Sequence, residues 1–94
     1  MIDEIALQRD VNRAARAEAL LRNELFQEAY ATFERELVEA WKGTPSDQPR
    51  IRERIWDMVK ANERHRIFLQ GIVRDGKIAQ ADLDMLAEQR KRSA

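Results

Sequence analysis

The chain contains no cysteine, which excludes disulfides, thiolate metal sites and cysteine nucleophiles together. It has a single histidine, so a zinc centre built from several imidazoles is excluded as well. No glycine-rich phosphate loop, nucleophile elbow or calcium loop is present. We therefore expect a protein that is not an enzyme and that binds neither a cofactor nor a metal.

Neither sign of charge is in excess, because 17 basic and 17 acidic residues give a formal net charge of zero. No overall field therefore attracts nucleic acid or an anionic membrane. The longest uncharged run, residues 67–73, is too short to span a membrane, and the first residues lack the pattern of a signal peptide. We expect a single small domain in the cytoplasm.

Glycine and proline are scarce, and neither occurs between residues 3 and 42. This stretch is rich in strong helix formers, but its apolar stripe shifts by about 100° after residue 25. Either the helix is interrupted there or its two halves pack on different partners. Asn23 suits an N-cap, so we expect two helices, at about 3–22 and 24–42.

Gly43 and the Thr44-Pro45 pair mark a loop, after which a second long helix is expected at about 48–74. Asp75-Gly76 predicts a turn, followed by a short helix at about 80–90 and a frayed basic tail at 91–94. The expected fold is all-α, an antiparallel helical hairpin with a kinked or broken first helix and a short C-terminal helix.

The second helix carries a repeat with alternating spacings of four and three, which is typical of a coiled-coil seam. Two of the seven positions, Asn62 and His65, are polar, and we expect them to be partly buried and to set helix register or oligomer state. The predicted seam comprises Ile51, Ile55, Met58, Asn62, His65, Leu69 and Ile72.

Several large apolar residues lie off these stripes and are surplus to a single helix pairing. One explanation is that the C-terminal helix covers them, using Leu83, Met85 and Leu86. We favour contact with a second copy or a partner, because the third helix offers few large apolar side chains and tryptophan beside arginine is typical of interface centres. The candidate interface residues are Trp41, Trp56, Ile67, Leu20 and Val38.

Basic residues form two candidate nucleic-acid contacts. Arg9, Arg13 and Arg16 lie on one side of the first helix, where they could follow a phosphate backbone. Acidic neighbours reduce the local charge, so the expected DNA affinity is weak. The second candidate is the C-terminal run of Arg90, Lys91 and Arg92.

Residues 20–26 (LLRNELF), 41–45 (WKGTP) and 52–56 (RERIW) carry a loose resemblance to small helical proteins encoded in tailed-phage and prophage genomes. These proteins accompany head and DNA-packaging genes, and the resemblance covers about residues 14–76. Phage small terminase subunits are similar in a broader sense, as short helical chains whose antiparallel hairpins assemble into rings. This chain departs from them in lacking a helix-turn-helix reader, and Glu24 stands where many of the phage proteins have proline.

The resemblance implies a non-enzymatic phage assembly or DNA-packaging accessory protein that acts by helix-mediated homo-oligomerisation. It also implies a phage packaging or head protein as a partner, in the host cytoplasm or the phage particle. Two alternatives remain open. One is a small monomeric inhibitor or adaptor that covers a host protein such as a defence enzyme, and the other is a weak, non-specific DNA binder.

Overall fold

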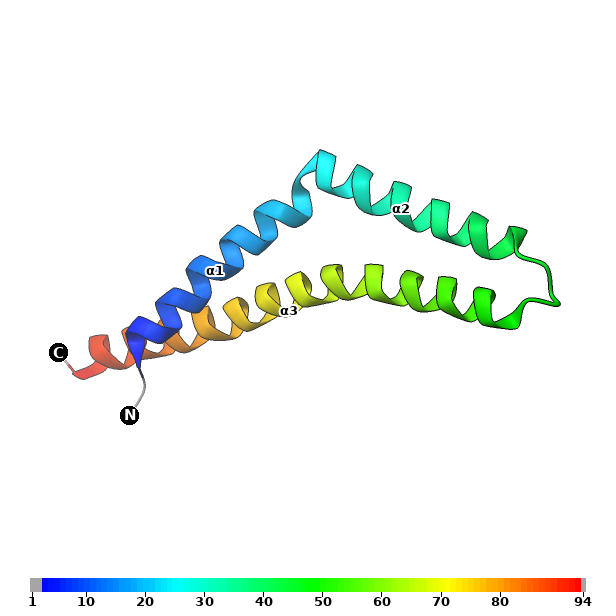
Figure 1. Cartoon of the computed structure of the whole chain (residues 1–94). Helices are drawn as coiled ribbons and strands as arrows, with labels where there is room; N and C mark the ends of the chain where they lie inside the picture. Colours follow the sequence, from blue (N-terminus) through cyan, green and yellow to red (C-terminus); the bar gives the residue numbers. More distant parts are fainter. Residues whose placement is uncertain (1–2, 94) are drawn as a thin grey trace. The chain divides into compact units, whose positions relative to one another are not determined.

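The computed structural model describes residues 3–93, which form three α-helices and no strand (Figure 1). Helix α1 spans Glu4–Arg22, α2 spans Glu24–Gly43 and α3 spans Pro49–Ser93. The all-α prediction is confirmed. None of these helices is long and apolar enough to cross a membrane.

A single capping residue separates α1 from α2. Asn23 has an extended backbone (φ −64°, ψ 123°), and its side-chain oxygen accepts a hydrogen bond of 2.9 Å from the Phe26 amide. The Gln27 amide group donates to the Leu21 carbonyl at 2.8 Å, which satisfies one of the carbonyls left unpaired at the end of α1. The predicted N-cap at Asn23 is confirmed, and local side-chain chemistry accounts for it.

The loop between α2 and α3 is also held by local hydrogen bonds. The Thr44 amide donates to the Trp41 carbonyl at 3.2 Å, and the Thr44 hydroxyl donates to the Ala40 carbonyl at 2.8 Å. Pro49 is the first residue of α3, where a missing N–H has little effect. Gly43 is the last helical residue and not a left-handed cap, because no glycine in residues 3–93 has a positive φ.

Helix α3 continues without interruption for 45 residues, so the predicted turn at Asp75-Gly76 and the separate helix at 80–90 are wrong. Residues 91–93 are helical and not frayed, and Ala94 lies outside the described residues. Gly76 is buried, and a Cβ atom on it would collide with the Ala14 side chain and lie 3.2 Å from the Asp10 carbonyl oxygen. This glycine therefore permits close helix packing and does not mark a turn.

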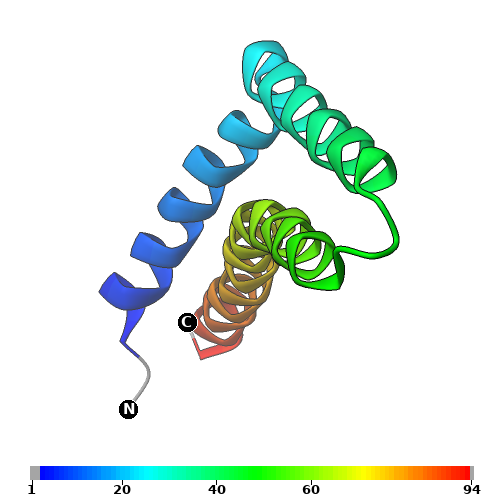
Figure 2. The ribbon, with the colours of Figure 1, turned by 45° about the vertical axis from the view of Figure 1, so that its right-hand side comes forward.

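The contacts divide the chain into two compact units. In unit 1, residues 3–20 pack with residues 69–93, so α1 lies alongside the C-terminal half of α3 (Figures 1 and 2). The buried residues there are small, namely Ala14, Ala17, Gly76 and Ala79. Small side chains let two helix backbones approach closely. The Glu4 carboxylate pairs with the Arg90 guanidinium in the same unit.

Unit 2 comprises residues 21–68, in which α2 packs with the first part of α3. Leu37 and Val59 are buried in this unit. The Trp41 and Trp56 rings contact each other, and the Arg66 guanidinium lies 5.4 Å from the centre of the Tyr30 ring. The contacts thus pair Trp41, near the end of α2, with Trp56, and Tyr30, earlier in α2, with Arg66.

The predicted seam on α3 is correct at some positions and displaced by one residue at others. Ile55, Asn62, Leu69 and Ile72 are half-buried as expected. In contrast, Ile51, Met58 and His65 are exposed, and the adjacent positions Arg52, Val59 and Arg66 contact α2 or are buried. The displacement arises because two arginines pack their side chains over aromatic rings, which hydrophobicity patterns do not register.

The close approach at Gly76 gives a stability prediction. We expect Gly76→Ala to lower the free energy of unfolding by about 1–3 kcal/mol, because the new methyl group must displace α1 from α3. Adding Ala14→Gly removes the opposing methyl group and recovers part of the loss. Urea denaturation followed by far-UV circular dichroism measures both effects. An increase in stability, as expected of an unconstrained helical glycine, would show that the contact is absent.

Candidate functional site

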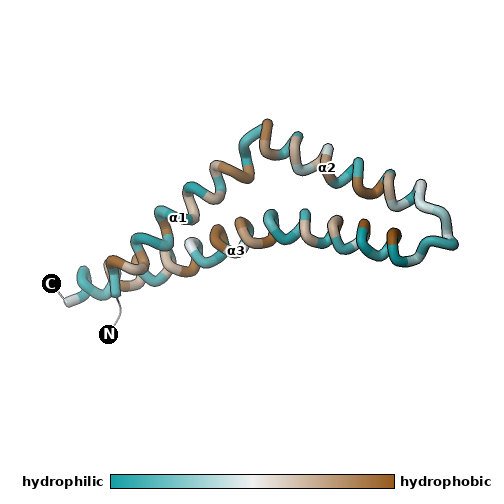
Figure 3. The backbone as a smooth tube through the Cα atoms, viewed as in Figure 1, coloured by the Kyte–Doolittle hydropathy of each residue, from teal (hydrophilic) through white to brown (hydrophobic). Residues whose placement is uncertain are grey.

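More large apolar side chains are exposed than buried in residues 3–93. Within residues 3–93 the buried hydrophobic residues are Ala14, Ala17, Leu37, Val59 and Ala79. Apolar residues are spread along all three helices, as Figure 3 shows. The exposed large hydrophobic residues are Ile5, Leu20, Leu25, Phe33, Ile51, Trp56, Met58, Ile67, Phe68, Ile78 and Met85. Exposed apolar residues that lie together, rather than singly, are typical of interaction sites.

The two tryptophans lie together at the edge of the α2–α3 packing. Their ring centres are 5.9 Å apart and the ring planes are tilted by 48°. Trp41 is half-buried, whereas Trp56 remains 45% exposed. The expectation that both lie outside the helix pairing is wrong in this respect, because the actual seam at Arg52 and Val59 brings Trp56 next to α2.

Two cations stack on this tryptophan pair. The Arg52 guanidinium lies 4.3 Å from the centre of the Trp41 ring, and the Lys60 ammonium lies 4.9 Å from that of Trp56. Arg52 also donates a hydrogen bond of 2.8 Å to the Thr44 carbonyl, which fixes its position. A shallow, mostly apolar hollow is lined by Trp41, Arg52, Glu53 and Trp56. It suits an apolar side chain of a partner better than a polar substrate.

The remaining candidate interface residues differ in exposure. Leu20 is 49% exposed and Ile67 is 60% exposed, whereas Val38 is half-buried. Leu20 belongs to unit 1, and the other two belong to unit 2. The structure thus brings together Trp41 and Trp56, and both Leu20 and Ile67 are exposed.

The two polar residues of the predicted seam behave differently. Asn62 is half-buried, and its side-chain nitrogen is fully buried without a hydrogen-bond partner. His65 is exposed, so its predicted burial is wrong. A buried amide without a partner destabilises a helix pairing. A role in specifying helix register would account for such a residue, so Asn62 remains the candidate for it.

The basic residues of α1 lie on an exposed surface. Arg9, Arg13 and Arg16 are all exposed, and with three neighbours they line an open hollow. The neighbours are Ile5, Gln8 and Asn12, of which Gln8 donates a hydrogen bond of 3.1 Å to Asn12. This surface presents cations beside amide groups.

The C-terminal basic run is largely engaged within the chain. Arg90 pairs with Glu4, and the Arg92 guanidinium lies 3.9 Å from a Glu88 carboxylate oxygen. Lys91 is exposed. Because carboxylates accompany two of the three cations, this run is a weaker candidate for phosphate contact than the α1 surface.

Sequence reasoning missed three of the most exposed apolar residues. Phe68, Ile78 and Met85 are 60%, 57% and 62% exposed, and none was predicted to contact a second copy or a partner. Ile78 and Met85 are seven residues apart on α3, so they share a face. The spacing can be read from the sequence. Because a turn was predicted at Asp75-Gly76, however, Ile78 was placed outside the helix that contains Met85.

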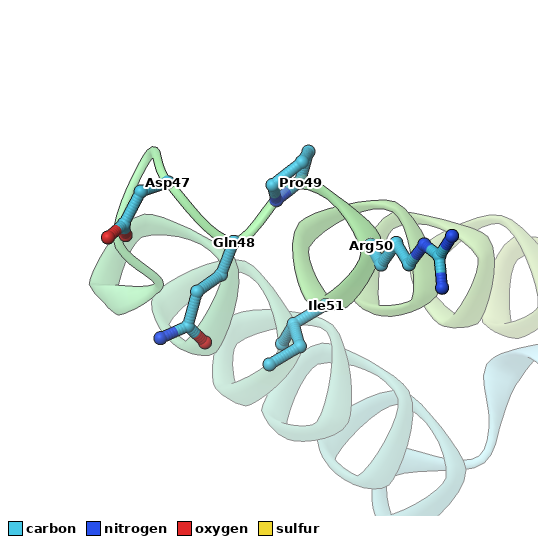
Figure 4. A pocket seen from close by; sticks show the side chains of 5 residues that line it. All are labelled: Asp47, Gln48, Pro49, Arg50 and Ile51. Atoms are coloured by element: carbon cyan, nitrogen blue, oxygen red, sulfur yellow. The ribbon is translucent and has the colours of Figure 1, made fainter.

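A further hollow at the start of α3 shows no convergent polar groups. Figure 4 shows the side chains of Gln48 and Ile51 extending to one side, while those of Asp47 and Arg50 extend away from each other. The arrangement offers no set of donors aimed at a common ligand. Within residues 3–93, no group of three or more side chains is placed to hold a metal ion.

No protein-family model, curated protein or solved structure matches the chain.

The unpaired amide of Asn62 gives a second stability prediction. We expect Asn62→Leu to raise the free energy of unfolding by about 1–2 kcal/mol, since leucine removes a buried donor without a partner. Urea denaturation of the purified chain measures the change. The matched control is Asn12→Leu, at an exposed position, which should change the free energy by less than about 0.5 kcal/mol. Loss of stability in Asn62→Leu would mean that the buried amide has a hydrogen-bond partner within the chain.

Proposed function

We propose that this chain is a non-enzymatic assembly protein that acts by self-association through its helix surfaces. The observation that supports it most is the excess of exposed over buried large apolar side chains in residues 3–93. Each helix packs on one side only, and the unpaired sides carry isoleucine, phenylalanine, methionine and tryptophan. A second copy of the same chain presents the same surfaces and so can cover them.

Apolar burial is comparable in energy to the cost of association. Burying one fully exposed large apolar side chain is worth about 1.5–3 kcal/mol, whereas association costs about 4–15 kcal/mol in lost freedom of motion. Most of the exposed residues are already about half-buried, so covering four or five of them on each copy gains about 6–15 kcal/mol in total, which offsets that cost. Trp56 and Ile67 are the proposed anchors, with Trp41 holding Trp56 in place.

The proposed setting is phage head assembly or DNA packaging, with small-terminase-like self-association of antiparallel helical hairpins. Its support is the resemblance over residues 14–76. The segments that carry the resemblance coincide with structural landmarks, since LLRNELF holds the Asn23 cap, WKGTP ends α2 and RERIW holds Trp56. A phage head or packaging protein is the proposed second partner.

The oligomeric state tests this function. We expect light scattering at micromolar concentration to give a mass of at least two chains, and Ile67→Glu to weaken association about tenfold or more because it places a charge at an apolar contact. Gln70→Glu, which adds the same charge at an exposed polar position one turn away, should leave association unchanged.

A monomer that persists to high micromolar concentration would contradict self-association. Exposed apolar residues would then favour the alternative of a monomeric inhibitor or adaptor, which forms a 1:1 complex with a host protein.

A second candidate function, weak DNA binding, is favoured by the exposed cations of α1. Arg9, Asn12 and Arg16 recur at spacings of three and four, so they form one row beside the hollow that Ile5 and Gln8 help to line. Such a row can contact successive phosphates but has no means of reading base sequence.

For this candidate we expect duplex DNA affinity to fall steeply between about 50 and 200 mM salt. The double variant Arg9→Gln/Arg16→Gln should reduce the slope of log affinity against log salt by about 2, since each phosphate contact contributes about 1. Fluorescence anisotropy of a labelled duplex measures it, with Lys77→Gln on α3 as the control. Absence of binding at the lowest salt concentration would exclude this function.

A further inference from the structure

One face of α3 in unit 1 is apolar, exposed and unused by the chain itself. Gly71, Ile78 and Met85 follow at seven-residue intervals, so they lie nearly in line along the helix. Ile78 is 57% exposed and Met85 is 62% exposed. Gly76, which packs against α1, lies about 140° or more from this line in helical projection. The face therefore points away from the α1–α3 packing.

Among residues 3–93, no close contact requires glycine at position 71. A Cβ atom at this position would meet only the Arg74 guanidinium, at 3.6 Å, which is an ordinary contact with a flexible side chain. Its backbone is helical and needs no positive φ. A glycine inside a helix lowers stability by about 1 kcal/mol relative to alanine. In contrast to Gly76, it leaves a notch on the exposed face of α3.

Two charged residues lie beside this line, at equal distances from its central residue, Ile78. Arg74 precedes Ile78 by four residues, and Asp82 follows it by four. Arg74 has only a loose ion pair with its neighbour Asp75, at 3.6 Å, and both side chains are more than 60% exposed. Its guanidinium can therefore turn to another carboxylate with little loss.

We propose that α3 pairs antiparallel with α3 of a second copy across this face, with the two-fold axis at Ile78. In this register Gly71 faces Met85 of the second copy, because both are seven residues from Ile78, and Arg74 faces Asp82, because both are four residues from it. In this single register the gap at Gly71 receives the long apolar side chain of Met85, and each Arg74 lies opposite an Asp82. The contact is isologous, as in most homodimers.

A parallel pairing lacks both matches. It would place Gly71 opposite Gly71, which leaves a void, and it would place Arg74 opposite Arg74 and Asp82 opposite Asp82. The inference rests on the proposed self-association and adds to the proposed anchor Trp56 in unit 2 a separate contact in unit 1, with its direction.

Single cysteines test the register, since the natural chain has none. Facing helices with axes 8–10 Å apart bring facing Cα atoms within about 4–6 Å, which suits a disulfide. Under mild oxidation Ile78→Cys should form a covalent dimer, and a mixture of Gly71→Cys and Met85→Cys should form the mixed disulfide in preference to either symmetric one. Asp84→Cys, exposed on another side of α3, should remain largely uncrosslinked.

Charge reversal provides an independent test that needs no oxidation. Arg74→Asp and Asp82→Arg should each weaken self-association about tenfold, because each places like charges opposite one another. Mixing the two variants should restore association as a heterodimer, since every facing pair is then of opposite sign. Light scattering and native mass spectrometry measure both results, and far-UV circular dichroism checks that each variant is helical.

The outcomes separate this contact from self-association in general. If the natural chain associates but Ile78→Cys crosslinks no faster than Asp84→Cys and the charge reversals have no effect, this face is not the contact and the proposed function stands. Crosslinking of Gly71→Cys with itself would overturn the antiparallel direction. A strictly monomeric natural chain would overturn both proposals.

Discussion

Within its unit, each helical segment of residues 3–93 packs against a single other segment, so the packing buries only one of its sides. A lone helix pair encloses little volume, and the buried residues are accordingly few and mostly small. Alanine and glycine let the backbones of unit 1 approach closely, but they remove little apolar surface from water. The larger apolar side chains are left at the margins and on the outer sides. Exposed apolar surface is thus a direct consequence of the packing, and the proposed function follows from it.

The features that depend on neighbouring residues could be predicted from the sequence. Helix content follows from residue propensity, and the junction at Asn23 follows from a side chain that bonds a backbone amide three residues later. The end of α2 and the start of α3 follow from Thr44 and Pro49 in the same way. In each case the interaction that decides the structure is contained within a few residues of the chain.

The features that depend on distant residues could not be predicted in this way. Gly76 is typical of a turn when only its neighbours are considered, but its role is set by Ala14, which lies 62 residues earlier in the chain. Arg52 and Arg66 are charged and lie outside the predicted seam, yet they stack on the rings of Trp41 and Tyr30. The register of the α3 seam, and with it the position of Trp56, depended on these contacts. The types of residue in the candidate site could therefore be predicted from the sequence, whereas their positions relative to one another could not.

The distribution of aromatic residues has a practical consequence. All six aromatic side chains (Phe26, Tyr30, Phe33, Trp41, Trp56 and Phe68) belong to unit 2, and residues 3–20 and 69–93 contain none. Fluorescence and near-ultraviolet dichroism therefore report on one unit alone, whereas far-ultraviolet dichroism reports on the helices of both. Comparing the two signals during denaturation shows directly whether the long α3 helix makes the two units melt as one cooperative body or lets the aromatic-free unit open first.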